Sequence, residues 1–181
     1  MVVAEKLLTV EAFWAKYADT RHELVKGIPV EMPPVSSEHA NITGFLVEFL
    51  APYVRKHDLG RVKIEAGYQL AGDTLRGPDV SFVSRERERH ITDPEKYVPF
   101  APDLAVEVVS PSESAATIQA KVGDYIRAGV RLVWVIYPDL KEIVVHYPDR
   151  TAQILTAEDT LTGGEVIPGF EVPVKVVFGG E

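Results

Sequence analysis

Three polar residues stand where packing alone would not place them. Asp79 opens the apolar stretch "DVSFV" directly after Gly77 and Pro78, and Glu107 interrupts the apolar stretch "DLAVEVV". Lys121 follows within a segment of helical periodicity. If these side chains converge, two carboxylates can bind Mg²⁺ or Mn²⁺, which polarises a phosphoryl oxygen and activates water. The ammonium would stabilise the negative charge of the transition state, so the set suits metal-dependent cleavage of phosphodiesters.

Each residue also has a purely structural explanation. Asp79 could cap a turn at the start of its strand, and Glu107 could lie at an exposed sheet edge or in a salt bridge. Lys121 could extend its ammonium to solvent from the margin of an apolar face. That face includes Ile118 and Tyr125, three residues before and four residues after the lysine, which favours an inward position. An ionised carboxylate buried without a partner is very costly, so Glu107 and Lys121 together favour a shared site.

The elements that position these residues follow from periodicity and from capping residues. Helices are predicted in "LLTVEAFWAKYA" after Thr9, in the segment after "PPVSS", and in "SPSESAATIQAKVGDYIRAG", where serines can cap the start and Gly129 the end. Strands are predicted in the segments "HELV", "IPVEM", "RVKIEAGYQL", "DVSFV", "DLAVEVV", "RLVWVIYP", "EIVVHYP" and "TAQILT". We expect "AGDTLRGP" to be a turn, "SRERERHITDPEKYVPFAP" a charged loop, the tail extended, and Gly60 to terminate the second helix.

This order of elements predicts an α/β layered domain with a mixed sheet. With 181 residues, of which 46% are hydrophobic, the chain is expected to be a single domain over residues 1–181, with residues 1–20 as an N-terminal helical extension. The absence of cysteine excludes disulfides, thiolate metal sites and a cysteine nucleophile. No apolar run is long enough to span a membrane, and the start lacks a secretory pattern, so we expect a soluble cytoplasmic protein.

The motifs resemble a known family. "GPDVSFV", "APDLAVEVVSPS", "KVGDYIRAGVRLVWVI" and "LTGGEVIPGF", together with "HELVKGIPVEMPP", "EHANI" and "GYQL", resemble the Uma family of restriction endonucleases, which is part of the PD-(D/E)xK nuclease superfamily. The resemblance covers most of the chain from about residue 20. It implies a restriction-endonuclease-like fold, a mixed β-sheet flanked by helices with an extra β-meander. It also implies a Mg²⁺-dependent endonuclease that acts on DNA, commonly as a homodimer.

The resemblance also implies roles for individual residues. Asp79 matches the metal-binding aspartate, and Glu107 matches the acid of the (D/E)xK element. Val109 stands where the superfamily has its lysine, and Lys121 on the following helix takes that place. Supporting positions are Tyr125, Glu65 and His39. By contrast, Asp103 repeats the Pro-Asp pair, but we expect it only to begin its strand.

Glu65 is explained about as well by a solvated strand face, and His39 by a polar position in the first helical turn. The net charge of −8 counts against nucleic acid, because most nucleic-acid-binding proteins carry a basic footprint. A local basic rim is predicted from Arg61, Lys63, Arg76 and the arginines of residues 85–89. The alternative function is a non-catalytic protein of nuclease fold that serves as a protein-interaction module, with the three charged residues forming a buried ion cluster.

Overall fold

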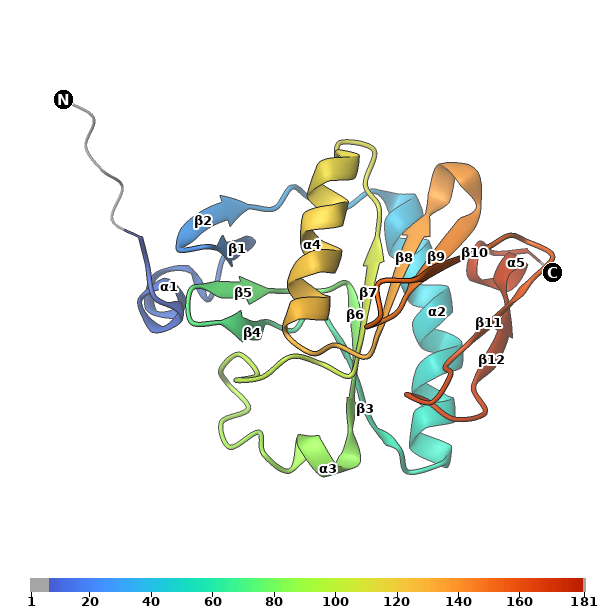
Figure 1. Cartoon of the computed structure of the whole chain (residues 1–181), viewed down its shortest axis with the longest axis horizontal. Helices are drawn as coiled ribbons and strands as arrows, with labels where there is room; N and C mark the ends of the chain where they lie inside the picture. Colours follow the sequence, from blue (N-terminus) through green and yellow to red (C-terminus); the bar gives the residue numbers. More distant parts are fainter. Residues whose placement is uncertain (1–6, 181) are drawn as a thin grey trace.

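The computed structural model of the chain describes residues 7–180. Residues 1–6, which belong to the predicted N-terminal extension, lie outside the described residues. A six-stranded mixed sheet forms the centre, in the order β10-β9-β8-β7-β6-β3 (Figure 1). Its strands are β3 (Gly60–Ile64), β6 (Val80–Ser84), β7 (Leu104–Val108), β8 (Leu132–Tyr137), β9 (Glu142–His146) and β10 (Ala152–Leu155). Strands β7 and β8 run parallel, whereas the other neighbouring pairs are antiparallel. The predicted fold class is therefore confirmed.

Two helices cover the central sheet on opposite faces. Helix α2 (Ser37–Lys56) packs on one face and α4 (Ala115–Arg127) on the other. Along β7, Leu104, Val106 and Val108 belong to the core shared with α2, whereas Ala105 packs in the core under α4. Because side chains alternate along a strand, Glu107 falls on the α4 face with Ala105. This register places an acid directly beneath the helix that carries the lysine.

The helices begin where the predicted capping residues stand. The side chains of Thr9, Ser36 and Ser114 each accept a hydrogen bond from the backbone N–H three residues later, at the starts of α1 (Val10–Tyr17), α2 and α4. Gly129 follows α4 with a positive φ of 91°, as expected of a helix terminator. Gly60 is different, because it starts β3, and α2 has already ended at Lys56.

A second sheet lies beside the first, in the order β2-β1-β5-β4, and α1 packs against it. Its strands are β1 (His22–Val25), β2 (Ile28–Glu31), β4 (Tyr68–Ala71) and β5 (Thr74–Arg76). Two predictions are wrong here. "RVKIEAGYQL" is not one strand, because Glu65 adopts a left-handed φ of 50° and the chain passes from the central sheet at β3 to the second sheet at β4. The predicted turn "AGDTLRGP" contains β5, which pairs with both β1 and β4.

Short elements complete the described chain. They are α3 (Arg85–Glu88) in the predicted charged loop, a 3-10 turn η1 (Pro138–Leu140), the hairpin strands β11 (Thr160–Thr162) and β12 (Glu171–Pro173), and α5 (Val174–Val177). The predicted β-meander is confirmed as β8, β9 and β10, but the tail, predicted to be extended, ends in the helical turn α5. Within residues 7–180, no helix has both the length and the apolar character required to cross a membrane.

Candidate active site

The strand topology brings Asp79 to Glu107. Strands β6 and β7 are antiparallel, and their register pairs Val80 with Val106. The residue before Val80 therefore lies beside the residue after Val106. One carboxylate oxygen of Asp79, Oδ2, accepts a hydrogen bond of 2.7 Å from the backbone N–H of Val108. The two acids are thus neighbours at the end of the sheet where β7 finishes, although 28 positions separate them in the sequence.

Glu107 is held by two side chains of α4. Its Oε2 accepts a hydrogen bond of 2.8 Å from Lys121 Nζ, and its Oε1 accepts one of 2.5 Å from the Tyr125 hydroxyl. The two donors are four residues apart and therefore lie on the same side of the helix. Only 2% of Glu107 and 4% of Lys121 are exposed. The predicted convergence of the two acids and the lysine is present in the structure.

Burial controls the electrostatics of this pair. It raises the pKa of the Glu107 carboxyl to about 7, although the charge of Lys121 lowers it. Burial lowers the pKa of the Lys121 ammonium, but the attraction of Glu107 outweighs this and the pKa lies above its ordinary value. Burial, reinforced by the negative charge of Glu107, raises the pKa of Tyr125 well above its usual range. At neutral pH Lys121 and Tyr125 therefore remain protonated and act as hydrogen-bond donors.

His39, in the first turn of α2, contacts Asp79 from the other side of the sheet. Its Nε2 lies 3.0 Å from Asp79 Oδ1, and the ring is buried. Burial lowers the pKa of His39, but the hydrogen bond to Asp79 and the surrounding acids outweigh this and raise it overall. Its Nδ1 is buried and has no hydrogen-bond partner among residues 7–180. His39 therefore belongs to the cluster, whereas Glu65 lies at its margin.

Glu65 lines a pocket with a volume of about 210 Å³, together with His39, Asp79, Glu107 and Lys121. The Glu65 side chain is 55% exposed, and it forms an ion pair of 3.3 Å with Arg21, whose side chain is 49% exposed. It is thus an acid at the margin of the pocket rather than part of the buried cluster. The predicted supporting residue Tyr125, by contrast, is fully buried against Glu107.

Glu113 is a member of the cluster that sequence reasoning missed. Its Oε1 lies 2.9 Å from Lys121 Nζ, and its Oε2 accepts a hydrogen bond of 3.1 Å from the backbone N–H of Ser110. The motif "SPSES" suggested only capping serines. Glu113 stands between two of these serines, in the loop that connects β7 to α4. Because this loop begins at the strand end that carries Glu107, an acid in it could have been expected near the site.

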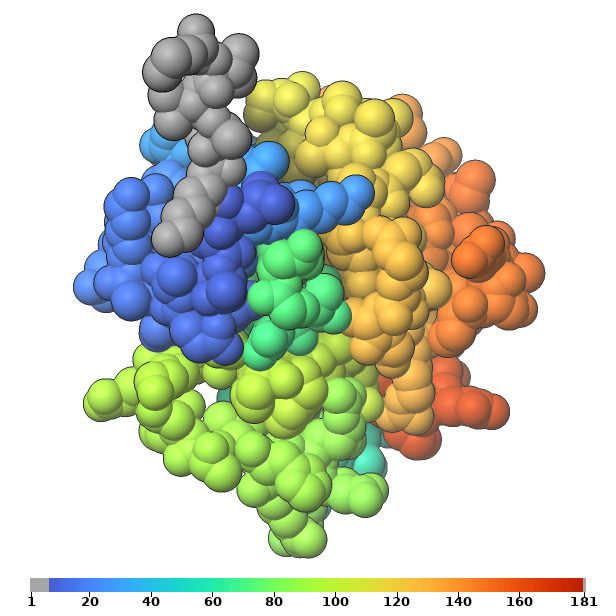
Figure 2. Space-filling model, turned by 60° about the vertical axis from the view of Figure 1, so that its left-hand side comes forward, coloured from blue at the N-terminus to red at the C-terminus, as the bar shows by residue number. Residues whose placement is uncertain are grey.

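A second buried ion cluster supports the first. Arg76 donates to Glu23 Oε2 at 2.7 Å and to Asp124 Oδ2 at 2.6 and 3.1 Å, while Glu23 Oε1 accepts from the backbone N–H of Gly77. Arg76 stands three residues before Asp79, and Asp124 three residues after Lys121. The cluster therefore ties the segment that carries Asp79 to the helix that carries Lys121. Figure 2 shows the β4–β5 hairpin between the N-terminal segment and α4.

The predicted basic rim is wrong in most of its members. Arg76 is 4% exposed and is engaged by Glu23 and Asp124, so it cannot meet a ligand at the surface. The β3–β6 register pairs Gly60 with Ser84, which places Arg61 and the arginines of residues 85–89 at the end of β6 remote from Asp79. Lys63 forms an ion pair with Glu88. Within the "RERER" stretch, Arg85 pairs with Asp58 and Arg87 with Asp103.

Asp103 has the role expected of it at that remote end. Its Oδ2 accepts a hydrogen bond of 2.8 Å from the backbone N–H of Ser84, and its Oδ1 accepts from Arg87 and Arg131. The residue is 3% exposed and immediately precedes β7. It anchors the start of the strand, and the second Pro-Asp pair of the sequence is not part of the cluster around Asp79.

The residues present fit a divalent cation bound by few protein ligands. Among residues 7–180 no group of three or more acidic, histidine or cysteine side chains has the spacing of a metal centre. Mg²⁺, however, is often held by one or two carboxylates and keeps several waters. Both oxygens of Glu107 already accept a hydrogen bond, but an ionised carboxylate offers about four acceptor positions, so each oxygen retains one. Asp79 and Glu107 are therefore suitable ligands.

A comparison with protein families identifies the chain. The family model "Uma2: Putative restriction endonuclease" matches residues 5–175. The chain belongs to the Uma2 family. This confirms the resemblance found in the sequence, and family membership supports nuclease function. No curated protein matches the chain.

A solved structure shares the Uma2 fold seen here. It is described as the crystal structure of a "putative nuclease belonging to DUF820 from Anabaena variabilis". The TM-score is 0.83 at 18% sequence identity, and the match covers 95% of this chain and 98% of that chain. The likeness at this identity concerns the fold, so the chemistry of the present chain has to be argued from its own residues.

Proposed function

We propose that this chain is a metal-dependent endonuclease that hydrolyses phosphodiester bonds in DNA, with Asp79 and Glu107 holding Mg²⁺ or Mn²⁺. One observation carries the proposal: acids from two neighbouring strands and a lysine from the following helix meet in one pocket. The description of the Uma2 family and that of the Anabaena protein as nucleases support it. The bound metal would polarise the scissile phosphate and lower the pKa of an attacking water.

Lys121 is proposed to stabilise charge rather than to act as a base. Its pKa is raised, so it keeps its proton at neutral pH. An ammonium has three donors: Glu107 Oε2 accepts one at 2.8 Å, and Glu113 Oε1 forms an ion pair with the nitrogen at 2.9 Å. A remaining donor is available for a phosphoryl oxygen, whose negative charge grows in the transition state. The two acids fix the direction in which that donor points.

Tyr125 and His39 are proposed to hold the two metal-binding acids in place. The Tyr125 hydroxyl fixes one oxygen of Glu107, and His39 Nε2 fixes one oxygen of Asp79. Because backbone Val108 N–H fixes the other Asp79 oxygen, that carboxylate has little freedom to rotate. Such preorganisation reduces the reorganisation needed when charge develops during the reaction.

Plasmid nicking in Mn²⁺ tests the proposal. We expect the wild type to relax supercoiled DNA and Lys121→Met to lose activity on the order of 100-fold, as when one donor to a developing oxyanion is removed. Lys175→Met is the matched control, since Lys175 is exposed on α5. Equal rates for Lys121→Met and the wild type, with both proteins folded, would contradict the assignment.

Metal binding provides an independent readout that does not require turnover. Calorimetric titration with Mn²⁺ should give heat with the wild type and much less with Asp79→Asn, whereas Asp93→Asn, which changes a side chain that is 46% exposed and does not line the pocket, should resemble the wild type. Equal heats for Asp79→Asn and the wild type would exclude Asp79 as a ligand. A chain that neither binds Mn²⁺ nor nicks DNA would instead fit the alternative of a protein-interaction module, which the acidic net charge of −8 favours.

A further inference from the structure

The pocket that contains the charged cluster also has an apolar wall. The apolar side chains of this wall are Phe13, Trp14, Tyr17, Met32, Val35 and Leu75. Three of them come from α1, two from the segment between β2 and α2, and one from β5. None of these side chains takes part in the chemistry proposed for the cluster. The pocket therefore combines a site suited to a phosphate with an apolar surface that has no assigned role.

Trp14 presents an aromatic face at this wall. The indole is half-buried, and it makes an edge contact with Tyr97, with ring centroids 5.4 Å apart and planes at 72°. An edge contact covers at most one face of the indole, so at least one face has no aromatic partner among residues 7–180. Tyr17, by contrast, stacks on Phe13 at 5.2 Å. Gly67 lies against the indole, where a Cβ would come within 3.7 Å of the ring, so the glycine leaves this part of the pocket open.

The volume of the pocket, about 210 Å³, suits a single aromatic heterocycle. A cavity of about 150 Å³ can hold one benzene ring. Pockets for drug-sized ligands are larger, at about 300–1,000 Å³. A nucleobase falls between these sizes, and its flat ring can stack on an indole. A base inside a duplex is stacked on its neighbours, so only an unpaired or extruded base can enter such a pocket.

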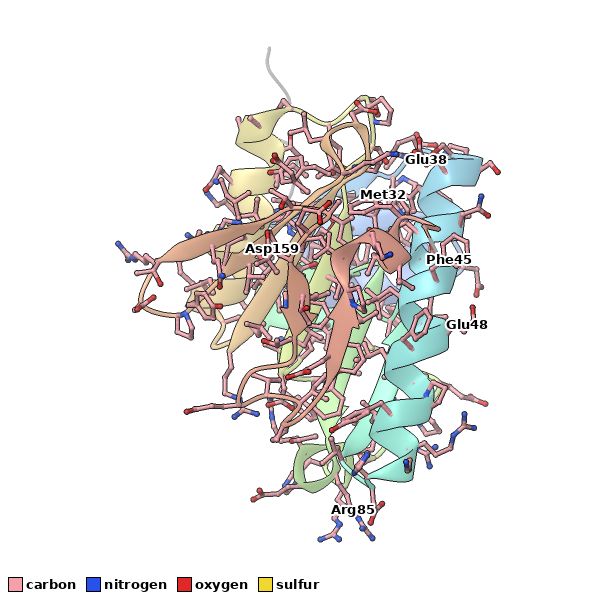
Figure 3. The ribbon with its side chains drawn as sticks, turned by 90° about the vertical axis from the view of Figure 1, so that its right-hand side faces the viewer. Met32, Glu38, Phe45, Glu48, Arg85 and Asp159 are labelled. Atoms are coloured by element: carbon pink, nitrogen blue, oxygen red, sulfur yellow. The ribbon has the colours of Figure 1, made fainter. Side chains whose placement is uncertain are left out.

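The charges around the pocket limit how much nucleic-acid backbone can bind there. In the described part of the chain, the permanent cations that line it are Arg21 and Lys121. The acids that line it are Glu23, Glu65, Asp79, Glu107 and Glu113. Figure 3 shows Met32 near the start of α2 and Arg85 at the far end of the molecule, so the arginines of residues 85–89 do not contribute to the pocket. A ligand with one or two phosphates and a stacking base fits this balance better than a long duplex does.

We propose that the pocket binds an unpaired nucleotide of single-stranded DNA, with its base stacked on Trp14 and its phosphate at the cluster of Asp79, Glu107 and Lys121. This inference rests on the proposed nuclease function, because it assigns the phosphate to the same cluster. A single strand enters directly, whereas a duplex first has to unpair and unstack the nucleotide. Negative supercoiling favours strand separation, so a supercoiled plasmid remains a substrate.

Tryptophan fluorescence reports stacking on Trp14 directly. The chain has two tryptophans, and the other one, Trp134, is buried in the core beneath α2. The probe is a single strand of about ten nucleotides, which is within the usual site sizes of single-strand binders. The titration is carried out in Ca²⁺, and gel analysis confirms that the strand stays intact. Binding should quench the emission of the wild type but not that of Trp14→Phe, which comes from Trp134 alone. A wild-type emission that stays constant while the strand binds would overturn the proposal.

Anisotropy of a labelled strand measures the affinity. Trp14→Ala should raise the dissociation constant roughly 5- to 100-fold, the usual contribution of one stacked base, and Trp14→Phe, with a smaller ring, should have an intermediate effect. Tyr147→Ala is the matched control, because Tyr147 is also half-buried but does not line the pocket. Circular dichroism checks the folding of each variant, and Trp14→Phe carries the test if Trp14→Ala does not fold. A wild type that does not bind the strand, or Trp14 variants that bind it as the wild type does, would refute the stacking site.

A matched duplex of the same sequence tests the preference for unpaired DNA. The wild type should bind and cleave the single strand at least about tenfold better than the linear duplex, which has to extrude a nucleotide. The logarithm of the association constant should fall with the logarithm of salt concentration with a slope of about −1 to −1.5, as expected for about two phosphates of a single strand. Equal or tighter binding of the duplex, or a slope of about −4 or steeper, would contradict the proposed substrate class.

Binding and cleavage together distinguish this inference from the nuclease activity on which it rests. A chain that binds single strands through Trp14 but cleaves neither strand nor plasmid in Mn²⁺ supports the base pocket and contradicts the nuclease. A chain that nicks the plasmid through Lys121, but whose Trp14→Ala variant binds and cleaves as the wild type does, supports the nuclease and overturns the base pocket.

Discussion

The substitution Arg76→Met tests whether the second ion cluster supports the fold around the site. Arg76 and Glu23 are each 4% exposed, and the guanidinium donates to Glu23 and Asp124. Methionine fills much of the volume of the arginine stem but provides no charge and no donor. Among residues 7–180, Asp124 keeps its hydrogen bond from Arg127, whereas Glu23 keeps only the one from the backbone N–H of Gly77. The variant therefore leaves one buried carboxylate without a cation.

The magnitude follows from that uncompensated charge. Removing one partner of a buried ion pair lowers the free energy of unfolding by about 3–5 kcal/mol, far more than the pair contributes relative to an apolar replacement. For a chain of this length, about 1 kcal/mol corresponds to a change in melting temperature of roughly 2–4 °C. Arg76→Met should therefore lower the melting temperature by about 6–20 °C. The wild type itself should have only about 5–15 kcal/mol of stability, so the loss is a large share.

The assay is urea unfolding at neutral pH, followed by circular dichroism. Arg21→Met is the matched control, because the Arg21–Glu65 pair is about half exposed and should contribute less than about 1 kcal/mol. The double variant Glu23→Gln/Arg76→Met removes the orphaned charge and should recover a large part of the loss. A loss below about 1 kcal/mol for Arg76→Met, or no recovery in the double variant, would refute the reasoning.

Two further substitutions have outcomes set by single contacts. At pH 8, above the pKa of about 7 of Glu107, Tyr125→Phe removes the donor to an ionised carboxylate and should lower the free energy of unfolding by about 1.5–3 kcal/mol. Tyr68→Phe removes a hydrogen bond to the neutral Ser81 hydroxyl and should lower it by about 0.5–1.5 kcal/mol. Thermal denaturation of both variants at pH 8 checks the order, and a larger effect at Tyr68 would contradict it. Gly60→Ala places a Cβ 2.1 Å from the Val83 carbonyl oxygen at a φ of 155° and should lower the free energy of unfolding by at least about 3 kcal/mol. Gly72→Ala is the control, because its Cβ would enter open space and should change stability little. Thermal denaturation compares the two variants, and equal melting temperatures would contradict this reading.

The residues of the site were predictable because each breaks a local pattern. Glu107 is a charge in an otherwise apolar strand, and Lys121 lies on the apolar face of an amphipathic helix. Such conflicts between residue type and position indicate that tertiary structure supplies a partner. The capping residues Thr9, Ser36 and Ser114 were predictable for a similar reason, since an oxygen at that position satisfies a free N–H.

The errors came from properties that periodicity does not encode. The alternation of "RVKIEAGYQL" continues past Glu65, although the chain there leaves one sheet for another. A pattern of period two reports which face is buried, not which strand is the partner. The basic rim failed likewise, because the position of Arg61 on β3 relative to Asp79 depends on the β3–β6 register, and the partners of Arg76 lie 53 and 48 positions away in the chain.

The charges around the pocket argue for a cation more strongly than the ligand geometry does. The two linked clusters contain five carboxylates from Glu23, Asp79, Glu107, Glu113 and Asp124. Against them stand two buried permanent cations, Arg76 and Lys121, and one exposed permanent cation, Arg127, beside Asp124. His39 adds a further positive charge when it is protonated. Burial and the neighbouring acids already raise the pKa of Glu107, which means that the pocket disfavours its full negative charge. A divalent cation between Asp79 and Glu107 would reverse that preference, so binding of metal and ionisation of Glu107 should strengthen one another.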